Sequence, residues 1–385
     1  MPQRAHKKSR NGCLECKRRH VRCDERQPIC SNCATAERVC GYGTRSLTAA
    51  PRSILPGSRA QLALTRPESP AGDHSPAPPA IPNQPVNMLH IELFHNLYTH
   101  IRTTFDPNRS IPWLADDMDP SMMTPYLVNE LLAFSALHLS IKCPNQQAYF
   151  RYHAAELQTN ALSIFKESAP QVTRESCIPL FIFAATLGIH MLCDTLIYRQ
   201  GDLPDFLARF VHFFRVYHGV RTIVNKAWHM IQDTPLGPSF AMGKDLYAFT
   251  GCLGHTCQSL LDRIDRANLG EHVTGIYRQA VEGLQSCATV IEKWDERHVG
   301  INAVTTWPIL MDIEFGEFLE QRRPEALVIL AHYACLLHRF RNFWLFGDSG
   351  AFVIREVTGY LGPEWEDWMV WPNQVLGSSA YVHSL

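Results

Sequence analysis

The 385-residue sequence has almost no net charge, and its first 40 residues contain no apolar run of the kind that a secretory signal needs. This absence favours an intracellular chain, in which cysteine thiols stay reduced. Common enzyme motifs are missing too: there is no His-Glu-x-x-His, no phosphate-binding glycine loop and no dinucleotide-binding fingerprint. We therefore do not expect an enzyme.

The near-neutral total conceals two oppositely charged parts. Residues 1–46 hold eleven Lys and Arg but only four acids, a balance of +7, so residues 47–385 carry −8. A basic head on an acidic body predicts that the head alone binds a polyanion.

Six cysteines lie in the first 40 residues, and their spacing is Cys-x2-Cys-x6-Cys twice over. They are Cys13, Cys16, Cys23, Cys30, Cys33 and Cys40. A Cys-x2-Cys pair lets two thiolates hold one soft metal ion from a tight turn. Six thiolates cannot give each of two ions four separate ligands, so two of them must bridge. The spacing therefore predicts a cluster of two zinc ions and six thiolates.

Disulfide bonding, iron–sulfur ligation and metal storage are less favoured roles for these cysteines. Three disulfides would suit a small secreted domain, but the segment lacks a secretory signal. Iron–sulfur ligation needs four cysteines at other spacings. Metal-storage segments rarely carry this much positive charge.

The densest basic run, residues 17–22, lies between the second and third cysteines and reads Lys-Arg-Arg-His-Val-Arg. We expect a short helix here, held at both ends by metal. Its Arg and Lys side chains can donate to guanine edges in the major groove, while flanking cations bind phosphates. The alternative is a solvated charged face that only keeps a small domain soluble. The candidate DNA-binding residues of the run are Lys17, Arg18, Arg19, His20 and Arg22.

Residues 11–42 closely resemble the fungal Zn2Cys6 binuclear-cluster DNA-binding domain. The likeness includes all six cysteines, the basic run, Asp24 after the third cysteine and Pro28 before the fourth. It implies two bridging cysteines and two pairs that each complete one zinc site. By this resemblance, Cys13 and Cys30 would bridge the two ions. Cys16 and Cys23 would complete one zinc site, and Cys33 and Cys40 the other.

The same resemblance implies contacts to double-stranded DNA. Arg19 and His20 fall where the family reads a CGG-type triplet, and His20 replaces the commoner Lys or Arg. A neutral imidazole donates one hydrogen bond without a fixed charge, so we expect an altered base preference. Lys7, Lys8 and Arg10 precede the cluster as candidate phosphate contacts, and with the basic run they form a candidate nuclear import signal.

Residues 46–87 contain nine prolines and no aromatic residue. Such a segment cannot bury a core, so we expect a disordered, proline-rich linker. The prolines also forbid the dimerising coiled coil that many family members place here. We expect a DNA-binding domain at 1–45, this linker, and a regulatory domain at 88–385 through which any homodimer would form.

Apolar residues in 88–385 recur every three to four positions, as in 88–105 and 127–140. Pro324 is expected to begin a helix that runs to about Trp344. Strand-like alternation is scarce. The body is therefore predicted to be all-α, with roughly ten or more helices.

An apolar run at 178–193 has sixteen residues, fewer than the roughly twenty that span a membrane. We expect a buried central helix that also suits the wall of an apolar pocket. Gly-Asp-Ser-Gly at 347–350 is interpreted as a helix-ending turn rather than a protease motif. Trp365, Trp368 and Trp371 either form an acidic-aromatic activation segment or, as we favour, anchor the C-terminal layer.

The body resembles the helical C-terminal domain of fungal sterol-uptake-control regulators. The similar stretches are 90–100, 131–140, 180–196, 210–223 and 324–354. In the best-understood relatives this domain binds a sterol and keeps the protein out of the nucleus until sterol falls. The resemblance implies a nuclear transcription regulator that works with the transcription machinery. If it follows those relatives, it is cytosolic when resting. Its body is either a sensor of a sterol or other apolar ligand, or a ligand-free interaction and dimerisation scaffold of a metabolic gene-cluster regulator.

Overall fold

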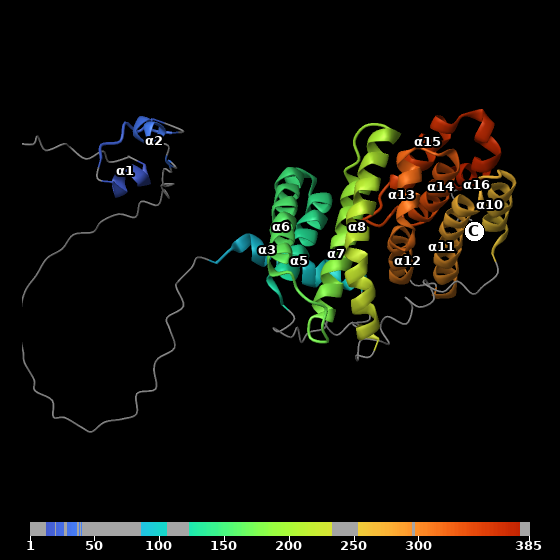
Figure 1. Ribbon diagram of the computed structural model, residues 1–385, viewed down its shortest axis with the longest axis horizontal. Coiled ribbons are helices and arrows are strands. Elements are labelled where there is room, and N and C mark those ends of the chain that lie inside the picture. The colour runs from blue at the N-terminus through green and yellow to red at the C-terminus, as the bar shows by residue number, and fades with distance from the viewer. Residues whose placement is uncertain are drawn as a thin grey trace, which may run out of the picture. The chain divides into compact units, whose positions relative to one another are not determined.

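The computed structural model divides the chain into two compact units, Met1–Ile81 and Pro82–Leu385 (Figure 1). The residues that it describes are 13–19, 21–26, 29–36, 38, 40, 86–105, 123–232, 253–294 and 297–377. All regular structure among them is helical. The predicted fold class, a small two-helix cluster domain followed by an all-α body, is confirmed. The proline-rich linker lies almost wholly outside the described residues.

Each helix of the small unit begins directly after the first cysteine of a Cys-x2-Cys pair. They are α1 (Leu14–Arg18) and α2 (Ser31–Thr35). The Cys13 sulfur caps α1 by accepting a hydrogen bond from the Cys16 N–H at 3.4 Å. Asp24 joins the two halves, because its carboxylate accepts from the Ser31 hydroxyl at 2.6 Å and the Ser31 N–H at 3.1 Å.

The helix expected over the basic run is shorter than predicted. It ends at Arg18, and residues 21–26 form no regular structure. The Val21 N–H bonds the Cys16 carbonyl at 3.1 Å, which turns the chain away from the helix axis. This turn is needed because the Cys23 sulfur lies beside Cys13 and accepts the Cys13 N–H at 3.4 Å. A continuous helix would carry Cys23 away from the other thiols.

The large unit is a layered array of helices joined mostly by short turns (Figure 1). Its first half contains α3 (Met88–Asn96), the π-turn η1 (Leu97–Ile101), α4 (Arg102–Phe105), α5 (Pro125–Lys142), α6 (Gln147–Ser168), α7 (Cys177–Ile197) and α8 (Leu203–Ile231). Its second half contains α10 (His255–Arg266), α11 (Glu271–Trp294), α12 (Arg297–Leu310), α13 (Ile313–Glu320), α14 (Pro324–Arg339), α15 (Ser349–Leu361) and α16 (Glu366–Gly377). Single 3₁₀ turns precede α6 and α16. The tightest pairs are α5 with α6, α7 with α8, and α14 with α15.

The predicted central apolar helix is confirmed as α7. Among the described residues it is the one helix apolar and long enough to cross a membrane, but 67% of its most apolar window is buried inside the body. Gly188 lets α8 approach, because a Cβ at this position would lie 2.0 Å from Cε2 of Tyr217. With most of this window buried and no residue of the helix exposed, α7 is a core helix.

The helix predicted to start at Pro324 does so, but it ends at Arg339 rather than near Trp344. Turns over residues 340–348 then direct Phe343 and Trp344 into the interior. The Gly-Asp-Ser-Gly segment begins α15 instead of ending a helix, and a Cβ on Gly350 would lie 2.4 Å from the Ala334 carbonyl oxygen. The predicted helix extended too far because apolar side chains that enter the core from turns look, in the sequence, like a continuation of the apolar face of the helix.

The three C-terminal tryptophans pack partly buried against the core. The ring of Trp371 stacks on His332, with centroids 5.3 Å apart, and Trp365 lies 5.1 Å from Trp368. Arg263 sits over the Trp368 ring at 5.8 Å. These contacts favour the anchoring interpretation.

Candidate metal centre and nucleic-acid interface

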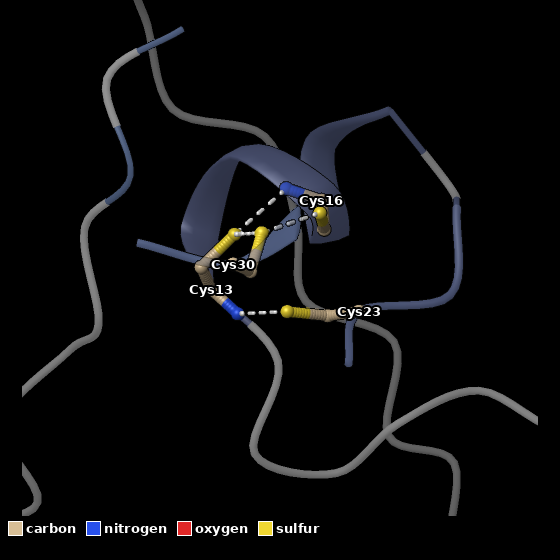
Figure 2. Close-up of side chains that lie close together, drawn as sticks. All are labelled: Cys13, Cys16, Cys23 and Cys30. Atoms are coloured by element: carbon tan, nitrogen blue, oxygen red, sulfur yellow. Dashed lines mark hydrogen bonds between the residues drawn. The ribbon is translucent and has the colours of Figure 1, made fainter. Parts of the chain in front are cut away.

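The small unit gathers all six of its cysteines, and two of them belong to both halves of the cluster. Figure 2 shows four of them close together: Cys13, Cys16, Cys23 and Cys30. The sulfurs form two groups, Cys13 with Cys16, Cys23 and Cys30, and Cys13 with Cys30, Cys33 and Cys40. Within each group every sulfur lies within 4.8 Å of the others. Two four-sulfur sites with a common edge are the arrangement that two tetrahedral ions sharing two ligands require.

The individual sulfur–sulfur distances fit zinc. Cys13 lies 3.7 Å from Cys30 and 3.6 Å from Cys33, and Cys16 lies 3.6 Å from Cys30. A tetrahedron with Zn–S bonds near 2.3 Å has edges of about 3.8 Å. The sulfurs are thus spaced for ligation around ions, and none of the six forms a disulfide bond.

Backbone N–H groups point at the sulfurs and favour their charged form. The Cys13 and Glu25 N–H groups each donate to the Cys23 sulfur at 3.4 Å, and the Cys30 N–H donates to Cys40 at 3.3 Å. Hydrogen bonds to a thiolate lower its basicity and hold its lone pairs in place. The Glu25 donor comes from the turn after Cys23, whereas the Cys13 and Cys30 donors precede the accepting cysteine by ten residues.

Burial nevertheless opposes the ionisation of this many thiols. It raises the pKa of Cys33 to about 12 and also raises the pKa of Cys16 and Cys30. Burial acts in the same sense on Cys13, but the hydrogen bond from the Cys16 N–H and those with neighbouring thiols outweigh it and lower the Cys13 pKa to about 6. Six thiolates therefore need compensating cations, and zinc supplies them.

The cationic side chains near α1 face solvent, but they are not equivalent. Lys17, Arg19 and Arg22 are exposed and make no ion pair with any residue that the structure describes. Arg18 is also exposed, yet it donates twice to the Glu15 carboxylate, at 3.0 and 2.9 Å. Of the remaining predicted DNA contacts, Lys7, Lys8, Arg10 and His20 lie outside the described residues.

Glu15 is a component of this surface that the sequence interpretation missed. Arg38, from beyond α2, reaches the same carboxylate at 3.3 Å. Its hydrogen bond with Arg18 and the charges of both arginines lower the pKa of Glu15. The spacing of three residues between Glu15 and Arg18 on a helix was the available signal.

The described residues of the large unit border at least two cavities of ligand size. The first, of about 320 Å³, is bordered by α7 and α8, and its wall includes Asp194 and Arg209, which form an ion pair at 2.8 Å. The second, of about 840 Å³, lies where α5 ends and is bordered by both polar and aromatic side chains. The cavity beside α7 therefore has both polar and apolar walls.

Comparison with known proteins identifies the small unit. Residues 11–49 match the fungal Zn(2)-Cys(6) binuclear cluster domain. A Zn(2)-C6 fungal-type transcription factor of Gibberella zeae is 27% identical over 97% of this chain and 87% of its own length. The Zn(2)-C6 fungal-type transcription factor afumD of Aspergillus fumigatus is 24% identical over 86% of each chain.

A sterol uptake control protein 2 of Candida albicans is 57% identical, but over 37 residues, 10% of this chain and 5% of that protein. The matches together confirm the resemblance to fungal Zn2Cys6 regulators. The sterol-related match is too short to span the helical body.

Proposed function

Since residues 11–49 form a fungal Zn(2)-Cys(6) binuclear cluster domain that binds two zinc ions, we propose that the chain is a sequence-specific, DNA-binding regulator of transcription in the nucleus. The observation that supports this most strongly is the pair of four-sulfur groups beside exposed, unpaired cations. The two relatives that cover most of the chain are transcription factors, which favours a regulator over an enzyme.

The six cysteines are the proposed ligands, with Cys13 and Cys30 bridging the ions. The support is that these two sulfurs alone, among the described residues, belong to both groups. When bound, zinc supplies a charge-compensating crosslink between the two halves. The chain supplies the thiolates, the N–H donors that orient them, and the Asp24–Ser31 hydrogen bonds that hold one half against the other.

Arg19 is the proposed main reader of a CGG-like triplet, helped by His20, while Lys17 and Arg22 contact phosphates or flanking bases. Arg19 lies at the C-terminal end of α1, exposed and without an ion pair to any described residue, so its guanidinium can donate twice to a guanine edge. Arg18 is a weaker candidate because Glu15 already holds one edge of its guanidinium, through Nε and Nη2. Lys7, Lys8 and Arg10 serve as phosphate contacts.

This proposal is tested by fluorescence anisotropy with the full-length, zinc-loaded chain. A duplex carrying CGG is compared with one in which the same bases are permuted, at several salt concentrations. We expect tighter binding to the CGG duplex, with a steep salt dependence on both because phosphate contacts release counterions. Equal affinity for the two duplexes under all conditions would show that the head binds DNA without reading a CGG triplet.

The helical body, residues 88–385, is proposed to regulate the head, with residues 46–87 as its tether. One candidate role is a sensor of a sterol or other small molecule, which would also allow a cytosolic resting state. The other is a ligand-free scaffold that dimerises or recruits the transcription machinery. The two roles are distinguished by purifying the full-length chain from a fungal host, extracting it with solvent and examining the extract by mass spectrometry. A stoichiometric small molecule supports the sensor, and an empty chain that forms a stable dimer supports the scaffold.

A further inference from the structure

The larger cavity of the body is built from segments far apart in sequence. Its wall takes residues from η1 and α4, from the end of α5, from α12 and from the turn after α14. Its volume of about 840 Å³ is in the range of small-molecule sites, roughly 300–1,000 Å³. The zinc centre belongs to the other unit, so this cavity has no part in the metal site.

A chain of hydrogen bonds fixes the tautomer of His138 in this wall. The Ser135 hydroxyl donates to the Leu93 carbonyl at 2.6 Å, so its oxygen accepts from Nδ2 of Asn96, at 2.7 Å. This leaves Oδ1 of Asn96 as an acceptor, 3.2 Å from Nδ1 of His138. Nδ1 must then carry the proton, and Nε2 of a neutral His138 is an acceptor.

His138 stays neutral at physiological pH. Its burial and the nearby charges of Lys142 and His100 lower its pKa to about 4. Its ring lies edge-on to Trp344, with centroids 4.7 Å apart. Since His138 borders the cavity, Nε2 is the acceptor that its ring has available for a ligand, beside the aromatic surface of Trp344.

Positive charge and apolar surface complete the wall. Among the described residues that border the cavity none is Asp or Glu, and Lys142, exposed at its edge, makes no ion pair with any described residue. Phe343 and Ile301 provide buried apolar surface, and the buried indole N–H of Trp344 has no hydrogen-bond partner among the residues that the structure describes. An unpaired cation, a neutral acceptor and an apolar floor suit one amphipathic ligand.

We propose that this cavity binds a small organic carboxylate whose apolar body carries a hydroxyl group. The carboxylate pairs with Lys142, the hydroxyl donates to Nε2 of His138, and the body packs on Phe343 and Ile301. The assignment deepens the sensor role proposed for the body, on which it rests. A sterol offers the hydroxyl but no charge for Lys142. A metal is disfavoured, because among the described residues only the cysteine groups of the small unit bring three ligand atoms within 4.8 Å.

Calorimetric titration of the full-length chain tests the proposal with meta-hydroxybenzoate as the probe. The comparison compounds are benzoate, which lacks the hydroxyl, meta-hydroxybenzyl alcohol, which lacks the charge, and inorganic phosphate, which lacks the ring. We expect meta-hydroxybenzoate to bind most tightly. Lys142→Met should weaken it about tenfold or more, as loss of a charge-assisted hydrogen bond does, while Lys142→Arg should retain most of the affinity.

Lys166→Met is the matched control, since Lys166 is an exposed lysine near the end of α6 that does not border the cavity. Three results would overturn the proposal: equal affinity of Lys142→Met and wild type, tighter binding of the neutral alcohol or of phosphate, or no binding where a Kd of about 1 mM would be detected. DNA affinity is measured on the same samples. Intact CGG binding with no carboxylate binding refutes the cavity assignment alone, whereas lost DNA preference in the wild type refutes the regulator.

Discussion

Gly188→Ala should destabilise the helical body, because α7 and α8 meet at this glycine. An added Cβ would lie 2.0 and 2.5 Å from two carbons of the Tyr217 ring. Tyr217 is 3% exposed and packs against Phe213, with ring centroids 6.1 Å apart, so the ring has no free space to occupy. Overpacking of this kind costs about 1–3 kcal/mol, and the contact is short enough to place it near the upper end.

The better helix propensity of alanine offsets about 1 kcal/mol of that cost. We therefore expect a net loss of about 2 kcal/mol in the free energy of unfolding, and a melting temperature lower by roughly 2–4 °C for each kcal/mol. Thermal melts followed by circular dichroism at 222 nm measure it, since the helical signal comes mainly from the body.

Gly219→Ala on α8 is the matched control. A Cβ there meets no atom within 4 Å, so the substitution should stabilise the chain by up to about 1 kcal/mol. A second check repeats Gly188→Ala in a Tyr217→Ala background, where the clash is absent and the effect should be neutral or stabilising. If Gly188→Ala alone were as stable as Gly219→Ala, the close packing of α7 on α8 would be wrong.

The remaining predictions concern the zinc centre, the DNA surface and the pH dependence of the body. Cys13→Ser should reduce the zinc bound by the full-length chain more than Cys40→Ser does, because Cys13 belongs to both sulfur groups and Cys40 to one. Mass spectrometry of the metal content measures this, and equal losses would contradict the bridging role of Cys13. Arg19→Ala should reduce the preference for CGG over permuted DNA by about 1–3 kcal/mol. Arg18→Ala should change this preference less, because Glu15 holds the Arg18 side chain. The reverse order in anisotropy titrations would exclude Arg19 as the main reader. His332 is fully buried, and burial lowers its pKa to about 4, so between its ordinary pKa near 6.5 and that value the unfolded chain binds more protons than the folded one. The stability of the body should therefore fall as pH falls through this window. His332→Phe should reduce the difference in stability between melts at pH 7 and pH 5, and an unchanged difference would show that His332 does not contribute.

The sequence predicted the metal centre better than any other part of the molecule, for a physical reason. Ligand spacing acts over a few residues, so the Cys-x2-Cys pairs and the turns after them are nearly independent of the remaining chain. The extent of the basic helix was wrong because it depends on where Cys23 must return, which is a tertiary constraint. The Glu15–Arg18 pair was readable from its spacing and was overlooked.

In the body, a continuous apolar run predicted α7, and a proline at the first helical position predicted the start of α14. The end of α14 was missed because Phe343 and Trp344 enter the core from turns. The larger cavity could not be predicted at all. His138 and Trp344 are separated by some two hundred residues and meet only through packing, and no local pattern encodes such a contact.

The central claim is that two zinc ions, held by six thiolates of which two are shared, create the DNA-reading surface. The most direct test measures bound zinc and CGG-duplex affinity together while a chelator removes metal stepwise from the full-length chain. We predict two zinc ions per chain at the start, and loss of the preference for CGG over permuted DNA as they leave, with recovery when zinc is restored. A zinc-free chain that retained the full CGG preference, or a fully active chain holding a single ion, would contradict the account.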